Sequence, residues 1–159
     1  MKRCSTILLR FAIFAAGAIV LAMCSGAGWV AVKVDPASDY VIWARVLLGG
    51  TCAAAIPCFT ALYQSFKLLG YIDTNRAFSD LSVKALKIIT RSSLAEFFIC
   101  TLGGLPFAYI IAKMDDAPGL VLIGMAIAGV AFVLFVFASV LNRLLQEAIV
   151  MKSENDLTI

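Results

Sequence analysis

Residues 119–141 read GLVLIGMAIAGVAFVLFVFASVL and contain no charged side chain. An α-helix of roughly 20 apolar residues crosses the ~30 Å of hydrocarbon in a bilayer, so this run is long enough to span one. The apolar residues follow one another without the alternation that a strand of a membrane barrel shows. The run therefore predicts a transmembrane helix, which we extend to about residue 145.

Three further apolar runs precede this one. The chain is 62% hydrophobic and only 14% charged, whereas soluble domains have roughly 45–50% apolar and roughly 25% charged residues. Lipid is therefore the expected solvent, and we predict an all-α integral membrane four-helix bundle in the cell membrane. Its single domain covers residues 1–159, with spans at about 7–32, 40–66, 88–112 and 119–145, a polar loop at 67–87 and a polar tail at 151–159.

Lys and Arg are distributed unequally between the two ends of these spans. Lys33, Arg45 and Lys113 lie at or near one end. Cytoplasmic loops of membrane proteins carry the excess of Lys and Arg. The bias predicts that both termini and the loop are cytoplasmic, since the residues on that side are Lys2, Arg3, Arg10, Lys67, Arg76, Lys84, Lys87, Arg91, Arg143 and Lys152.

The start of the first span also has features of a cleaved signal. Residues 21–24 read LAMC and resemble a lipoprotein cleavage box. However, Met23 stands where a small residue is required, and the apolar run continues past Cys24. We therefore expect an uncleaved first span.

The sequence contains no pattern that is typical of an active site. No His is present, and the five cysteines form no C-x-x-C pair, so a zinc site is not expected. No nucleophile–base pair or Gly-rich phosphate loop is visible. We predict that the protein is not an enzyme and has no catalytic residues, cofactor or metal. The basic residues form short clusters beside apolar runs, so direct binding of nucleic acid is not expected either.

Two charged residues fall inside the predicted spans. Glu96 faces either the bundle interior or a water-filled space, as intramembrane charges usually do, and could serve as a sensing, proton or ion site. We favour a structural interpretation, in which Glu96 pairs with Arg91 or Arg143. Arg45 is interpreted as snorkelling to headgroups or pairing with an outer-loop aspartate, with a ligand role as the alternative.

Local signals mark two kinks and one helix start. Pro57 and Pro106 are expected to bend the second and third spans, either to frame a cavity or to adjust packing. Ser79 is the expected N-cap of a short amphipathic helix that leads into the third span. Lys84 and Lys87 would then face water or headgroups, with a plain helix start and snorkelling lysines as the alternative.

Three stretches carry a resemblance to a known family. They are Ala61-Leu62-Tyr63-Gln64 with Lys67-Leu68-Leu69, then Ala77-Phe78-Ser79 with Val83 and Leu86, and the ending Ser153-Glu154-Asn155-Asp156-Leu157-Thr158-Ile159. Together they resemble the bacterial domain-of-unknown-function family 2975 over nearly the whole chain. The resemblance implies a small four-span bacterial membrane protein without an established activity. Many members of the family are encoded beside a helix-turn-helix regulator.

The leading hypothesis is therefore a non-enzymatic regulatory or sensory partner of a cytoplasmic transcription regulator. The alternatives are an oligomeric transporter or channel-like component, in which Arg45 and Glu96 line a path through a homo-oligomer, and a membrane immunity-type protein. The expected partners are the lipid bilayer, the helix-turn-helix regulator and other copies of the chain. The candidate contact residues for the regulator are Phe78, Ser79, Lys84, Lys87, Glu154, Asn155, Asp156, Leu157, Thr158 and Ile159.

Overall fold

A computed structural model describes residues 2–35, 40–74 and 79–156, with side chains placed between Thr6 and Glu154. All regular structure in these ranges is helical. The elements are α1 (Lys2–Lys33), α2 (Tyr40–Asp73), α3 (Asp80–Ile99), the π-helical turn η1 (Cys100–Gly104), α4 (Leu105–Met114) and α5 (Gly119–Asp156).

Four helical segments are long and apolar enough to cross a membrane, and α3, η1 and α4 form one of them. The segments are Thr6–Lys33, Tyr40–Asp73, Asp80–Met114 and Gly119–Glu154. Their mean hydropathy lies between 1.7 and 2.9. The predicted all-α membrane fold with four spans is confirmed.

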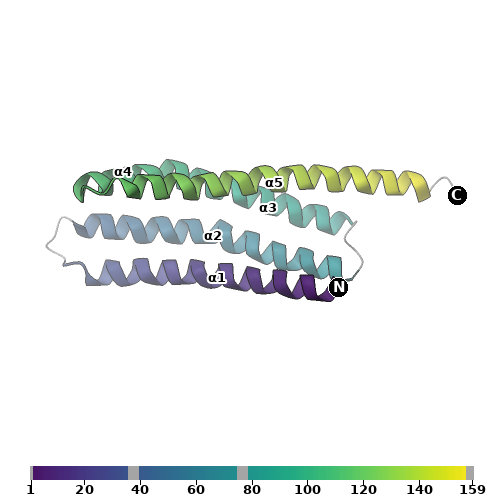
Figure 1. Cartoon of the computed structure of the whole chain (residues 1–159), viewed down its shortest axis with the longest axis horizontal. Helices are drawn as coiled ribbons and strands as arrows, with labels where there is room; N and C mark the ends of the chain where they lie inside the picture. The colour runs from purple at the N-terminus through teal and green to yellow at the C-terminus, as the bar shows by residue number, and fades with distance from the viewer. Residues whose placement is uncertain (1, 36–39, 75–78, 157–159) are drawn as a thin grey trace.

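The helices pack in chain order, each against its neighbours in the sequence (Figure 1). Helix α1 packs on α2, α2 on α3, and both α3 and α4 on α5. Within the described residues, α1 has no comparable contact with α3, α4 or α5. The bundle is therefore an open row. Large apolar side chains cover the edge helices, such as Phe11 on α1 and Phe137 on α5, which are 75% and 64% exposed; acyl chains solvate such surfaces at no hydrophobic cost.

Small side chains fill the interfaces between the helices. Such residues let two backbones approach closely in lipid, where packing replaces the hydrophobic effect as the driving force. Gly124 on α5 marks the tightest approach, because a Cβ there would lie 3.2 Å from Leu105 Cδ2 and 3.4 Å from Ala108 Cβ on α4. The buried small residues are Ala27, Ala44, Ser82, Ala85, Ser92, Ser93, Ala108, Ala112, Ala128, Ala131 and Ala138.

The start of α1, the end of α2, the start of α3 and the end of α5 lie at the same end of the molecule (Figure 1). The end of α1, the start of α2, the end of α4 and the start of α5 lie at the opposite end. This placement is what four antiparallel crossings require. The end that carries the two termini is called the terminal end below; its predicted cytoplasmic location stays a prediction.

The helices extend further into the terminal end than the hydropathy runs indicate. Helix α2 continues to Asp73 and α3 begins at Asp80, so most of the 67–87 segment is helical. Helix α5 continues to Asp156, and its last turns project beyond the other helices (Figure 1). Residues 151–156, the first part of the predicted polar tail, therefore belong to the helix. Polar residues such as Ser153 do not stop this helix: its hydroxyl donates to the Val150 carbonyl at 2.8 Å.

Both intramembrane prolines disturb the helices around them. Pro57 lies inside α2, whose course bends near its middle in Figure 1. Pro106 lies at the start of α4, directly after the π-helical turn. A proline cannot donate to the carbonyl four residues earlier and its ring clashes with that carbonyl. The chain responds with a wider turn, in which the Leu105 amide donates to the Cys100 carbonyl five residues back.

A leucine at position 124 should loosen the contact between α5 and α4. We expect Gly124→Leu to lower the free energy of unfolding by about 1–3 kcal/mol, the usual cost of overpacking a tight interface. Gly129→Leu is the matched control, because an added Cβ there meets nothing within 4 Å. Unfolding in mixed micelles measures both variants, and equal losses would contradict the close approach.

Candidate functional site

Glu96 lies near the middle of the crossing formed by α3, η1 and α4. Its side chain is half-buried, and the buried Oε2 atom has no hydrogen-bond partner among the described residues. The thiols of Cys58 on α2 and Cys100, one helical turn after Glu96, are close enough to interact electrostatically with its carboxylate. Cys24 of α1 lies near Cys58. Thiols from α1, α2 and η1 thus lie near the Glu96 carboxylate or near one another at the centre of the molecule.

The predicted pairing of Glu96 with Arg91 or Arg143 is wrong. Arg143 instead donates its Nε to Glu147 Oε1 at 3.0 Å on the exposed face of α5. Arg91 is exposed, and none of the ion pairs between described residues includes Glu96. The reason is geometric, because five residues along an α-helix correspond to a rotation of roughly 140° around the axis. Arg91 and Glu96 therefore lie on different faces of α3.

Arg45 is exposed on α2 and takes part in none of the ion pairs in the described part of the chain. One of the outer-loop aspartates that could pair with Arg45, Asp39, lies outside the described residues. Asp115 instead accepts a hydrogen bond from the hydroxyl of Tyr40 at 3.5 Å, which ties the start of α2 to the end of α4. The exposed position of Arg45 fits the snorkelling interpretation.

Ser79, Lys84 and Lys87 lie together at the start of α3. Ser79 has the extended backbone of an N-cap, but its hydroxyl makes no capping bond to the helix. Its carbonyl accepts from the amides of Ser82 at 3.0 Å and Val83 at 3.2 Å. Both lysines are exposed. The predicted N-cap position is therefore correct, although the hydroxyl does not perform the capping.

The remaining candidate contact residues lie in or beyond the last turns of α5. Glu154 is exposed at the terminal end. Asn155 and Asp156 belong to the helix, while their side chains are outside the described residues. Phe78 and residues 157–159 also lie outside the described part of the chain. The projecting end of α5 lies past the start of α3 (Figure 1), so the candidate surface has two parts.

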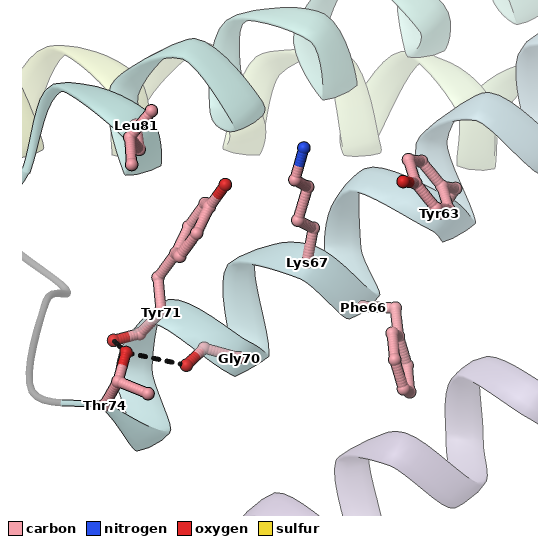
Figure 2. A pocket seen from close by; sticks show the side chains of 7 residues that line it. All are labelled: Tyr63, Phe66, Lys67, Gly70, Tyr71, Thr74 and Leu81. Carbon is pink, nitrogen blue, oxygen red and sulfur yellow. Dashed lines mark hydrogen bonds between the residues drawn. The ribbon is translucent and has the colours of Figure 1, made fainter.

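A groove of about 660 Å³ opens between α2 and the start of α3 at the terminal end (Figure 2). Lys67 and Tyr71 direct their polar atoms into it from α2, and Leu81 faces them from α3. The Thr74 hydroxyl donates to the carbonyls of Gly70 at 3.0 Å and Tyr71 at 3.2 Å, which fixes the end of α2. The groove is lined by Tyr63, Phe66, Lys67, Gly70, Tyr71, Thr74 and Leu81.

The sequence contains a signal for this groove that hydropathy did not reveal. Tyr63, Lys67 and Tyr71 recur at intervals of four residues, which places them along one face of a helix. An apolar run that ends in such a stripe of amphipathic side chains indicates a polar face at the membrane boundary.

Beside the groove, an ion pair fastens α1 to α2. Arg10 donates an N–H to Asp73 Oδ2 at 2.6 Å, and its guanidinium lies 5.5 Å from the centre of the Phe66 ring. This pair compensates the charge of Asp73. Lys67 takes part in no ion pair with a described residue, so its charge is the one left uncompensated in the groove.

The fold and these features define a small multi-pass α-helical membrane protein, with charge concentrated at one end and, at its centre, a carboxylate that forms no ion pair with a described residue. The chain belongs to the family described as "protein of unknown function (DUF2975)", which matches residues 26–159. It is 43% identical over 164 residues to the uncharacterized membrane protein YoaS of Bacillus subtilis (strain 168), and the match covers 100% of both chains. No solved structure matches it.

Removing the charge at position 96 should stabilise the fold. We expect Glu96→Gln to raise the free energy of unfolding by about 1 kcal/mol, because an amide has a much smaller desolvation cost than an unpaired carboxylate. Glu147→Gln, which breaks an exposed pair, should change it by less than about 0.5 kcal/mol. Thermal unfolding in the same detergent compares them. A loss of stability in Glu96→Gln would indicate that the carboxylate has a counter-charge in the membrane.

Proposed function

We propose that the protein is a non-enzymatic membrane regulator that binds a cytoplasmic helix-turn-helix transcription regulator at its terminal end. The observation that carries the proposal is that the start of α1, the end of α2, the start of α3 and the projecting end of α5 gather at that end (Figure 1). A soluble partner can reach helical turns that extend past the rest of the bundle. The cytoplasmic orientation of this end is part of the proposal and rests on the Lys and Arg bias.

The two parts of the candidate surface have different chemistry. At the start of α3, Lys84 and Lys87 are exposed and offer positive charge. At the end of α5, Glu154 is exposed and precedes a sequence with alternate apolar residues, Leu157 and Ile159. A segment of that pattern can add as a strand to the edge of a partner's sheet. A partner that contacts both parts would hold α3 and α5 in one relative position.

The proposed regulation requires two packings of the bundle with different affinity for the partner. A signal shifts such an equilibrium only when it favours one state over the other. The row arrangement supports this idea, because among the described elements α5 packs mainly on α3, η1 and α4, and does so through small side chains. The bend at Pro57 and the turn at Cys100–Gly104 are the places where α2 and the third crossing depart from regular helix.

Deleting residues 154–159 should release the regulator. We expect the truncated chain to capture the purified helix-turn-helix regulator more than about tenfold less well, since a few contact residues carry most of the energy of an interface. The double variant Lys84→Gln with Lys87→Gln should reduce capture to a smaller degree. Lys33→Gln with Lys113→Gln, at the opposite end, is the matched control.

The readout is capture on tagged protein in nanodiscs, with thermal unfolding to verify that each variant is folded. Capture that is unchanged by the truncation would remove the tail from the proposal. Capture that falls equally in the opposite-end control would show that bulk charge and not a surface is recognised.

A second candidate function rests on Glu96 alone. Glu96 is a half-buried carboxylate at the centre of a span, and none of the described basic residues pairs with it. Such a carboxylate is typical of an ion or proton pathway. Since four spans are few for a transporter, this function would need a homo-oligomer. Flux in liposomes tests it: Glu96→Gln should abolish any flux of the wild-type protein, and absence of flux in the wild type for the ions tested would count against it.

A further inference from the structure

The side chains that line the groove at the terminal end combine a single positive charge with apolar and aromatic surface. Leu81 and Tyr63 are apolar or largely so, and Lys67 is the only charged residue among the lining side chains. Its ammonium group points into the open space, and the hydroxyl of Tyr71 points the same way (Figure 2). The ammonium forms no ion pair with a carboxylate of the described residues, and Asp73 at the end of α2 is paired with Arg10. The groove therefore offers one positive charge and a hydroxyl donor above apolar walls.

The position of the groove matches the boundary between hydrocarbon and headgroups. The uncharged run of the second span, residues 46–66, ends directly before Lys67. Lys67 lies six residues before the end of α2, a distance of about 9 Å along the helix axis. A ligand in the groove can therefore keep an anionic group level with Lys67 while its apolar part stays among the acyl chains.

These features require a ligand that is both anionic and apolar. A soluble phosphate compound would leave the apolar walls uncovered. A metal ion would need several oxygen or sulfur ligands, and no described cluster of His, Cys, Asp or Glu could hold one. A zwitterionic lipid would bring its own cation towards the Lys67 ammonium. An acidic phospholipid is both anionic and apolar, and its headgroup need not bring a cation.

We infer that the groove binds one acidic phospholipid, with the headgroup phosphate at Lys67 and Tyr71 and an acyl chain against Leu81. The ammonium and the phenol donate hydrogen bonds to the phosphate oxygens, which are strong acceptors. The other cations in this part of the structure differ from Lys67. Arg10 is occupied by Asp73 and Phe66, and Lys84 is exposed without lining the groove. The inference stands independently of the proposed regulator.

Native mass spectrometry of the full chain, released from mixed micelles, tests the inference. The micelles contain phosphatidylglycerol and phosphatidylcholine in equal amounts and with the same acyl chains. We expect the wild-type protein to retain one phosphatidylglycerol in preference to phosphatidylcholine. Lys67→Gln should lower this retention about fivefold, the effect of one basic residue beside an anionic lipid. Tyr71→Phe should lower it by a smaller factor.

Two further variants separate a defined site from general attraction. Lys84→Gln removes a positive charge from the same end outside the groove and should leave retention unchanged. Leu81→Trp narrows the groove beside its apolar wall without changing its charge and should also reduce retention. Millimolar glycerol phosphate should not displace the lipid, because it cannot use the apolar wall.

Three results would overturn the inference. The first is equal retention of the two lipids by the wild-type protein. The second is an equal effect of Lys67→Gln and Lys84→Gln, which would mean that the whole charged end attracts lipid. The third is displacement by glycerol phosphate, which would identify a site for a soluble phosphate. Thermal unfolding of each variant in the same micelles ensures that a lost lipid reflects a lost contact.

Discussion

The backbone hydrogen bonds within each helix are the constraint on which the rest of this structure depends. Hydrocarbon offers no water to an unpaired amide, so each crossing must satisfy its own donors and acceptors. Thr51 and Thr90 remain compatible with this requirement, because their hydroxyls donate to carbonyls of the preceding turn, Leu47 and Leu86, both at 2.9 Å. Pro106 violates the pattern, and the π-helical turn before it is the local solution, since the Leu105 amide finds the Cys100 carbonyl instead.

With the backbone satisfied inside each helix, association depends on close packing. Ala128, Ala131 and Ala138 bury one face of α5, and Gly124 continues that face towards α4. The opposite face keeps large side chains such as Val133 and Phe137, which are 64% exposed. In water such a helix would need a cover, whereas in lipid it needs none. The open row is therefore a stable arrangement for this composition, and it leaves the outer faces of α1 and α5 available to lipid or to other chains.

Properties that depend on one helix alone could be predicted from the sequence. Hydropathy located four spans because a bilayer imposes a fixed apolar length. Ser79 was identified as the N-cap of α3 because this position before a helix favours a serine. Relations between helices could not be predicted. Whether Glu96 meets a cation depends on which face of α3 it occupies and what packs there, and the structure places thiols and no described cation beside it. The groove was missed for the same reason, since Leu81 and Lys67 belong to different helices.

Helix α3 connects the features that the other helices hold separately. It is the described helix that packs extensively on both α2 and α5. Its first turns form one wall of the groove through Leu81 and carry the exposed Lys84, while its centre carries Glu96. A small rotation of α3 would therefore change the surroundings of Glu96, the width of the groove and the support of α5 together. Packed interfaces made of small side chains favour discrete arrangements over gradual deformation. A signal received at the centre or in the groove thus has a direct structural route to the projecting end of α5, where the proposed regulator would bind.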